Sequence, residues 1–299
     1  MKHALSVIFL VLLYSAEAPG QPYIDIINLK YQSFLPVKYY HDDNKLSVEE
    51  SYLSLNIPIP LKNKDYILTG GVFDQLSFNS PHGQKDLYAF NIQLGYLKNW
   101  KNTKWKTLIV VLPKISSDQL KVSNGSFQQG GLLLFTYVKS TSLQYKFGGY
   151  YNKEFFGNFY MPLLGVEWKP LPRLNIFGVL PGYMIIEYKA NSKFYSGISY
   201  QCLTASYRLH DGENYAFARN GDKFWGQMQL KLFLNFYIKK YVVAFGEFGH
   251  TLCRKYEVYS KSNQRIVHPV LNKTHDGFIF NLGLAFRIRQ DVSSLNKIE

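Results

Sequence analysis

Strict two-residue alternation is the feature of this sequence that most restricts its fold. In the segment 278–288 every second side chain is apolar, and the positions between them hold Asn281, Gly283, Ala285 and Arg287. Successive side chains of a β-strand point to opposite faces, so this pattern describes a strand with one apolar and one mixed face. A helical period of 3.6 residues does not fit it. The segment is therefore predicted to be a strand.

The same alternation recurs along most of the chain. The segments 53–59, 88–96 and 224–238 show it clearly. Weaker candidates lie at 23–34, 66–78, 105–112, 131–139, 143–151, 159–168, 174–180, 184–189, 193–207 and 241–252. Some of these are expected to merge or to lie outside the sheet. We therefore predict an all-β fold, a single antiparallel transmembrane β-barrel of about 12 strands, with about 14 as the alternative, because bacterial single-chain barrels have even strand numbers.

The first 20 residues have the order of a secretory signal peptide. A basic start at Lys2 is followed by an apolar run from Ala4 to Tyr14 and by a stretch of small residues. The run is too short to span a bilayer as a helix, which needs about 20 residues. Cleavage after Ala18 and cleavage after Gly20 both fit. The predicted organisation is a signal peptide at 1–20 and one outer-membrane barrel domain at 21–299.

Aromatic residues are unusually frequent, with 24 Tyr, 22 Phe and 4 Trp in 299 residues. Barrel walls place aromatic side chains on the lipid-facing band and in the girdles at both interfaces. Trp100 and Trp105 flank a basic turn, which suits such an interface. A secreted soluble β-sandwich that binds a glycan also has alternating strands. Its outer face would be charged, whereas here the polar face is rich in Gln, Asn, Ser and Gly.

The net charge of +13 and the two cysteines limit the possible partners and stabilisers. A basic exported chain suits contact with outer-membrane lipid and lipopolysaccharide, or an anion-preferring lumen, while solvated loop lysines explain the charge equally well. Nucleic acid is not an expected partner. Cys202 and Cys253 pair if their strands are adjacent, although we favour two small wall residues without a disulfide.

The last strand carries a second signal. Its residues from Asn281 to Ile288 follow the polar-x-Gly-x-x-aromatic-x-apolar pattern that the barrel assembly machinery recognises in closing strands. A polar tail from Gln290 to Glu299 follows, where many barrels end on an aromatic residue. We predict that this strand closes the barrel by pairing with the segment 23–34.

The central stretch resembles a known family. Three segments carry the resemblance: 159–170, which reads FYMPLLGVEWKP, 174–181, which reads LNIFGVLP, and the residues around Glu187-Tyr188-Lys189 and Lys193-Phe194-Tyr195-Ser196-Gly197. They are similar to a family of uncharacterised outer-membrane barrel proteins of Bacteroidota, known only as a domain of unknown function. The resemblance covers the central part of the chain. It implies a barrel and a location in the outer membrane, and it supplies no activity or catalytic residue.

Candidate catalytic groups are few. His250 follows Glu247 by three residues, and an odd separation on a strand sends the two side chains to opposite faces. His41 with Asp42 and Asp43, and His210 with Asp211, lie in polar loops without a recognisable nucleophile. Neither a Gly-x-Ser-x-Gly elbow nor a zinc-type His pair is present. No enzyme, cofactor or metal site is therefore predicted, and a lipid-modifying enzyme remains the alternative.

Charged residues on wall strands are the remaining candidates. A Lys or Arg that faces lipid at the midplane costs about 2 to 4 kcal/mol, so such residues should face the lumen and pair there. The candidates are Glu167, Lys169, Glu187, Lys189 and Lys231. They form either a packed, ion-paired filling or the selectivity layer of a narrow, porin-like pore. The predicted function is thus a non-enzymatic outer-membrane barrel, acting as a narrow channel or as a structural or binding element of the envelope.

Overall fold

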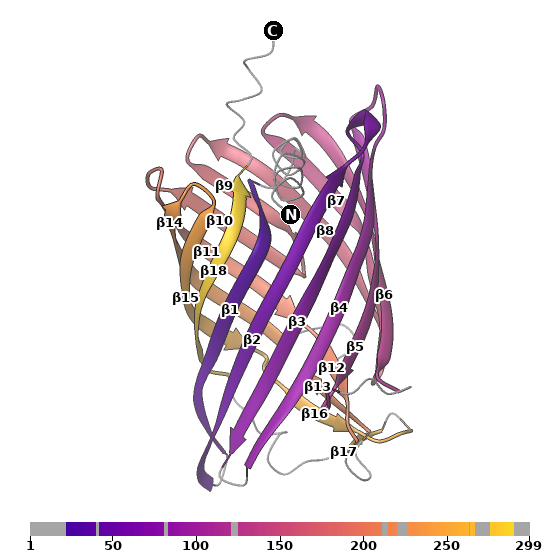
Figure 1. Ribbon diagram of the computed structural model, residues 1–299, viewed down its shortest axis with the longest axis vertical. Coiled ribbons are helices and arrows are strands. Elements are labelled where there is room, and N and C mark those ends of the chain that lie inside the picture. The colour runs from indigo at the N-terminus through magenta and orange to yellow at the C-terminus, as the bar shows by residue number, and fades with distance from the viewer. Residues whose placement is uncertain are drawn as a thin grey trace, which may run out of the picture.

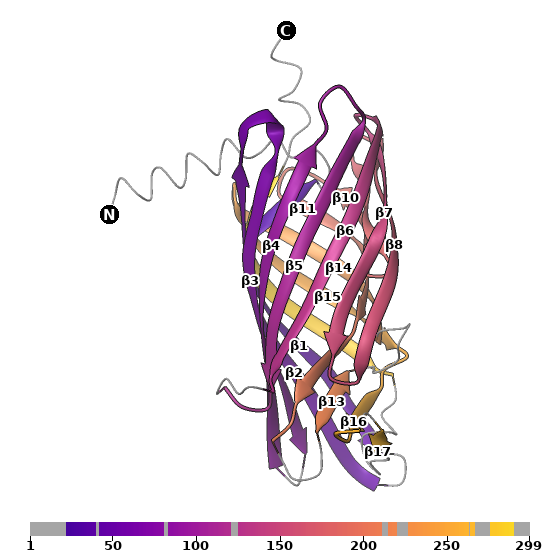
Figure 2. The same ribbon diagram turned by 90° about the vertical axis from the view of Figure 1, so that its right-hand side faces the viewer.

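The structure, a computed structural model, describes residues 22–39, 42–80, 83–120, 125–210, 215–219, 227–262, 264–266 and 276–289. Within these ranges the chain forms a closed antiparallel β-barrel whose strands are tilted against the long axis (Figures 1 and 2). Fourteen strands make the wall, and the ring closes where the last strand pairs with the first. The expectation of about 12 strands is thus wrong, and the alternative of about 14 is right. The predicted signal peptide lies outside the described residues.

The wall strands follow the chain around the ring. In ring order they are β1 (Tyr23–Tyr39), β2 (Asp42–Pro60), β3 (Tyr66–Ser80), β4 (Gly83–Asn99), β5 (Trp105–Ser117), β6 (Phe127–Ser140), β7 (Leu143–Glu154), β8 (Gly157–Leu171), β9 (Leu174–Leu180), β10 (Tyr183–Lys189), β11 (Phe194–Leu203), β14 (Gln227–Lys239), β15 (Val242–Leu252) and β18 (Phe278–Arg289). None of the weaker segments merges with a neighbour. The two shortest, β9 and β10, stay separate because Pro181-Gly182 turns the chain between them.

Four short strands form a second, smaller sheet at one end of the barrel. They are β12 (Ala205–Arg208), β13 (Ala216–Arg219), β16 (Tyr256–Tyr259) and β17 (Arg265–Ile266), and they pair in that order. They belong to the two long connections β11–β14 and β15–β18. The segment predicted as one strand over 193–207 is divided, because β11 ends at Leu203 and β12 begins at Ala205. We call these four strands the mouth sheet.

The two ends of the barrel differ. One end carries short turns, such as 141–142, 172–173 and 240–241, together with the start of β1 and the end of β18. The opposite end carries the mouth sheet, and Figure 1 shows it in the lower part of the barrel, level with the lower ends of the wall strands. We call them the turn end and the loop end. In outer-membrane barrels, short turns face the periplasm and long loops face the outside.

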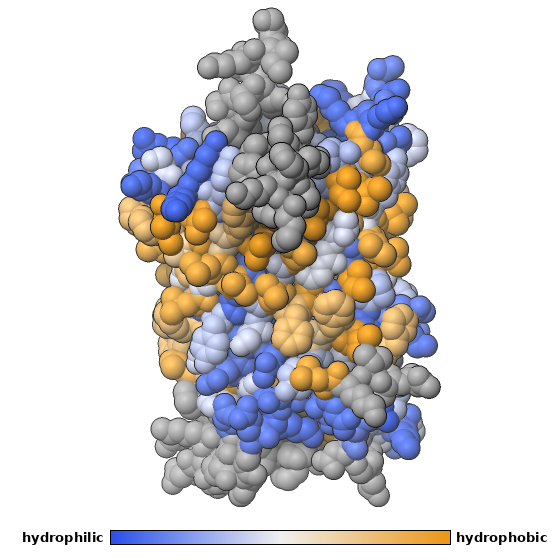
Figure 3. Space-filling view, in the orientation of Figure 1, coloured by the Kyte–Doolittle hydropathy of each residue, from blue (hydrophilic) through white to orange (hydrophobic). Residues whose placement is uncertain are grey.

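The outer surface of the wall has the predicted alternation. Phe280 and Leu282 are 45% and 52% exposed, whereas Asn281 between them is 0% exposed. In Figure 3 a band of hydrophobic side chains lies between two hydrophilic ends. Near the turn end, the ring of Trp105 lies 5.0 Å from Tyr137 and 5.8 Å from Phe147, as in an interfacial aromatic girdle. A closed barrel with an apolar outside excludes the soluble β-sandwich.

No helix within the described ranges combines the length and the apolar character that a membrane-spanning helix requires.

The closing pair of strands agrees with the prediction. In the β1–β18 ladder Tyr23 lies opposite Arg289 and Phe34 opposite Ile279, with one register shift between Asp25 and Ile27. The two cysteines are not joined by a disulfide. Cys202 lies near the end of β11 and pairs with Met228 of β14, which pairs with Leu252 of β15. The strand that carries Cys202 is thus separated from the Cys253 region by β14.

A buried carboxylate fixes one of the turns. Asp65 ends the turn between β2 and β3, and its carboxylate accepts hydrogen bonds from the Lys98 ammonium (2.8 Å), the Asn99 N–H (2.8 Å) and the Tyr96 hydroxyl (2.9 Å). The Lys98 ammonium and the Asn99 N–H hold the pKa of Asp65 below its ordinary value, against the opposing effect of burial. The charged form of Asp65 therefore stabilises the folded barrel.

This turn predicts a pH-dependent difference in stability. Because the folded-state pKa of Asp65 is lowered, its contribution is present above about pH 3.9 and is lost as the pH falls through the folded-state pKa. Asp65→Asn should lower the free energy of unfolding at pH 7 by about 1 kcal/mol, allowing for the exposure of Lys98. The difference between the variant and the wild type should shrink as the pH is lowered from 7 to 2. Urea titration of the refolded barrel at both pH values measures this, and an equal deficit at both would contradict it.

Candidate functional site

The barrel encloses a cavity of about 480 Å³. It reaches from Tyr23, Asp25 and Arg287 near the turn end to Tyr207 and Arg219 of the mouth sheet. Its lining mixes charged, amide and aromatic side chains. Small-molecule sites in proteins are concave and have volumes of about 300 to 1,000 Å³, so this lumen is the candidate site.

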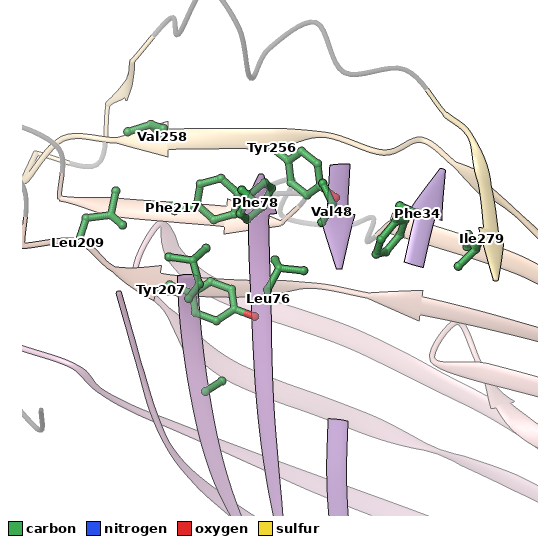
Figure 4. Packing of buried hydrophobic residues seen from close by; sticks show 12 residues of the cluster. Phe34, Val48, Leu76, Phe78, Tyr207, Leu209, Phe217, Tyr256, Val258 and Ile279 are labelled. Atoms are coloured by element: carbon green, nitrogen blue, oxygen red, sulfur yellow. The ribbon is translucent and has the colours of Figure 1, made fainter. Parts of the chain in front are cut away.

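One face of the mouth sheet packs against the inside of the wall. Tyr207, Phe217, Tyr256 and Val258 point to this face and meet side chains of β1 to β4 (Figure 4). The wall residues in this cluster are Phe34, Val48, Leu76, Phe78, Leu87 and Ala89, together with Ile279 of β18. The ring of Phe78 lies 5.2 Å from the rings of both Phe217 and Tyr256, in edge-to-face geometry. Burial of these aromatic side chains holds the sheet inside the barrel.

Two polar contacts anchor the same face. Arg219 is 2% exposed, and its Nη2 lies 2.6 Å from Oε2 of Glu50 on β2. Gln32 donates to the same Glu50 oxygen at 3.3 Å. The Tyr207 hydroxyl donates to Asp74 on β3 at 3.3 Å. A buried ion pair that loses one partner is strongly destabilised, so Arg219 and Glu50 are the most sensitive point of this attachment.

The opposite face of the mouth sheet meets the other side of the wall. The Ser206 hydroxyl donates to Glu154 at the end of β7, and Gln128 of β6 donates to both Ser206 (2.8 Å) and Glu154 (3.0 Å). On the same face of the mouth sheet, Ala216, Ala218 and Tyr259 pack on Phe156 of the β7–β8 turn. The sheet therefore spans the lumen from β1–β4 to β6–β8. It closes the loop end of the cavity.

The edge strand β12 is tied directly to wall strand β5. Arg208 pairs with Ser117 in parallel orientation, and the Asp118 N–H donates to the Arg208 carbonyl at 3.0 Å. His210 follows, with Nδ1 2.8 Å from Oδ1 of Asp118 and its backbone N–H donating to the other oxygen at 3.1 Å. Burial would raise the pKa of Asp118, but the hydrogen bonds from His210 outweigh it and lower that pKa.

This contact brings a serine, a histidine and an aspartate together. Ser117 and Asp118 lie more than ninety positions before His210, so the sequence analysis placed His210 beside Asp211 only and missed both. In a catalytic triad the nucleophile and the carboxylate use different ring nitrogens. Here the Ser117 hydroxyl and the Asp118 carboxylate both contact Nδ1, and Ser117 is only 1% exposed. The arrangement anchors the mouth sheet and does not activate a nucleophile.

Three of the five lumen charges predicted from sequence are buried in ion pairs. Glu167 pairs with Lys146 of the neighbouring strand β7, and Lys231 pairs with Glu247 of β15 at 2.9 Å. Glu187 of β10 pairs across the lumen with Arg289 of β18 at 2.5 Å.

The other two residues predicted to face the lumen, Lys189 and Lys169, are less buried than these three. Lys189 is half-buried, with its ammonium 5.8 Å from the centre of the Tyr195 ring. Lys169 is exposed, because the β8–β9 ladder shifts register between Trp168 and Leu171 beside the turn. The pairs Asp25–Arg287 and Glu50–Arg219 were not predicted from sequence, because their members lie far apart in the chain.

The remaining histidine candidates do not form a site. Glu247 lines the cavity, whereas His250 packs edge-to-face on the outward ring of Phe278, so the two lie on opposite faces of β15. His41 lies outside the described residues. Among the residues that are described, no group of three or more His, Cys, Asp and Glu side chains is arranged to hold a metal ion.

A protein-family model matches residues 71–287, from β3 through the mouth sheet to β18. Its description is "Domain of unknown function (DUF6268)". The chain belongs to this family. The match is wider than the central stretch from which the resemblance was inferred, and it includes most residues that hold the mouth sheet. No curated protein matches the chain.

Solved structures resemble this DUF6268 barrel. The COG4313 outer-membrane channel from Pseudomonas putida F1 has a TM-score of 0.51 and 8% identity, over 91% of this chain and 98% of that one. The NanC porin has a TM-score of 0.41 and 8% identity, over 88% and 100%. Outer membrane phospholipase A from Escherichia coli has a TM-score of 0.35 and 11% identity, over 92% and 96%. At such identities the likeness to the channel shows the fold alone: an outer-membrane-type barrel.

Proposed function

We propose that this protein is a non-enzymatic outer-membrane channel with a narrow lumen, closed at the loop end by the mouth sheet. The observation that carries the proposal is the cavity of about 480 Å³, lined by charged, amide and aromatic side chains, next to a sheet that spans the lumen. A purely structural barrel has no need of such a cavity. The contacts that hold the sheet are hydrogen bonds, the Arg219–Glu50 ion pair, two apolar clusters and the short β5–β12 pairing, and none of them belongs to the ladder of the wall.

The proposal has further parts. The segment 1–20 directs export and is then removed, and the barrel assembly machinery inserts the chain through its closing strand β18. The apolar band contacts outer-membrane lipid, and basic side chains at its borders contact lipopolysaccharide. The lineage is that of the resembling family, Bacteroidota. A structural or binding element of the envelope is the competing function within the same fold.

Planar-bilayer recording tests the channel function. Protein refolded in detergent should migrate differently on a gel before and after heating, which shows that the barrel is folded. It should then give brief, small openings, because the docked sheet closes the lumen most of the time. A folded barrel that stays silent at all voltages, including in the Arg219→Met variant described in the Discussion, would favour the structural role and refute the channel.

A further inference from the structure

The charges that line the cavity largely neutralise one another. Asp25 accepts two hydrogen bonds from Arg287, at 2.5 and 2.9 Å. Lys231 pairs with Glu247 at 2.9 Å, and Lys114 lies 3.8 Å from Glu154. With the Arg219–Glu50 pair, four of the five cationic side chains of the lining have a carboxylate partner. Such a lining offers little net charge to an ion that enters it, in contrast to a selectivity layer of one sign.

Four uncharged amide side chains also line the cavity, and they take no part in these ion pairs. Asn91 and Gln93 lie on β4, Gln201 on β11 and Asn235 on β14, and all four line the cavity. Their side chains make no hydrogen bond to another described residue. Strands β4 and β11 are seven strands apart in both directions around the ring, so the amides lie on opposite walls. Each amide offers both donors and an acceptor, which is the pattern that a hydroxyl group matches.

Aromatic rings complete the lining. Tyr52, Tyr207, Phe233 and Phe245 border the same cavity. Aromatic faces provide flat apolar surface, which suits the C–H faces of a sugar ring, while amides bind its hydroxyl groups.

From this combination we infer that the lumen binds a small neutral saccharide between the amides of β4 and the amide of Gln201 on β11. The inference rests on the proposed channel function and adds the class of solute. Paired charges exclude solutes that carry an uncompensated charge, because such a solute loses hydration without gaining a partner. The amides and rings provide contacts that a hydroxylated neutral solute can use.

Swelling of proteoliposomes measures this preference. Glucose, glucuronate and glucosamine are close in size and differ in charge, and each is supplied at equal osmolality to vesicles that carry the Arg219→Met barrel. Glucose should enter about tenfold faster than either charged sugar, and its entry rate should saturate with concentration. Replacing Gln93 and Gln201 together by methionine should lower glucose entry about tenfold, since two hydrogen bonds to the solute are lost. The saturation should disappear as well.

A matched control makes the same substitution of glutamine by methionine at a position outside the cavity. Gln84 is exposed at the loop-end start of β4, and Gln84→Met should leave the glucose rate unchanged. Faster entry of glucuronate than of glucose, or linear glucose entry in a barrel that conducts ions, would overturn the saccharide inference and leave the channel intact. Absence of both ion conductance and swelling would refute the channel function itself.

Discussion

Arg219→Met is expected to release the mouth sheet and to raise the open probability of the channel about a hundredfold. Methionine keeps much of the side-chain volume but leaves Glu50 buried, with only the Gln32 hydrogen bond at 3.3 Å. Removing one partner of a buried ion pair costs about 3 to 5 kcal/mol, and every 1.4 kcal/mol corresponds to a tenfold change in an equilibrium. The cost falls on the docked state alone, because in the released state Glu50 faces water. Single-channel recording of refolded protein measures the result.

A double variant separates the effect of the lost charge from the effect of the lost packing. Glu50→Gln combined with Arg219→Met leaves no uncompensated charge, and replacement of a buried ion pair by uncharged groups is often neutral. The double variant should therefore stay closed, much like the wild type. If the single and double variants open equally, packing around Arg219 holds the sheet and the ion pair does not. If both variants conduct but neither opens more often than the wild type, the mouth sheet does not close the conducting path.

The wall was predictable from sequence because lipid and lumen impose opposite demands on neighbouring side chains. In β18, the outward Phe280 and Leu282 and the inward Asn281 follow the alternation, and the pairing of this strand with β1 follows from closure. The strand count was underestimated because β9 and β10 have only seven residues each. Such short segments show too few alternations to be separated from a loop. Pro181-Gly182, which marks the turn between them, was not used as a signal.

The mouth sheet was not predictable in the same way. Its strand β13 reads Ala216-Phe217-Ala218-Arg219, and all four residues are buried, because wall side chains cover both faces. A strand that is buried on both sides has no polar face and therefore no two-residue pattern. The anchoring partners also lie far apart in the chain, with 169 positions between Glu50 and Arg219. Charged residues could be assigned to the lumen, but the partners of Glu187 and Glu50 lie far away in the chain and could not be assigned.

A disulfide between β5 and β12 should abolish conductance reversibly, even in the Arg219→Met background. Ser117 and Arg208 are paired residues of adjacent strands, and neighbouring strands lie about 4.8 Å apart, within the range of Cα separations that a disulfide spans. The pair Ser117→Cys and Arg208→Cys is introduced after Cys202→Ala and Cys253→Ser remove the native thiols. Oxidation then fixes the edge of the mouth sheet to the wall. Reduction should restore the currents of the Arg219→Met barrel.

The control is a disulfide between two neighbouring strands of the wall. Tyr145 of β7 and Val166 of β8 are paired within the wall. A disulfide between cysteines at these positions joins two strands that never separate, so oxidation should leave the currents unchanged. Continued conduction after oxidation of the β5–β12 pair, with the bond confirmed by its shifted gel migration, would mean that ions pass without movement of this edge. Opening would then have to occur on the β1–β4 side, where Arg219 and Tyr207 contact Glu50 and Asp74.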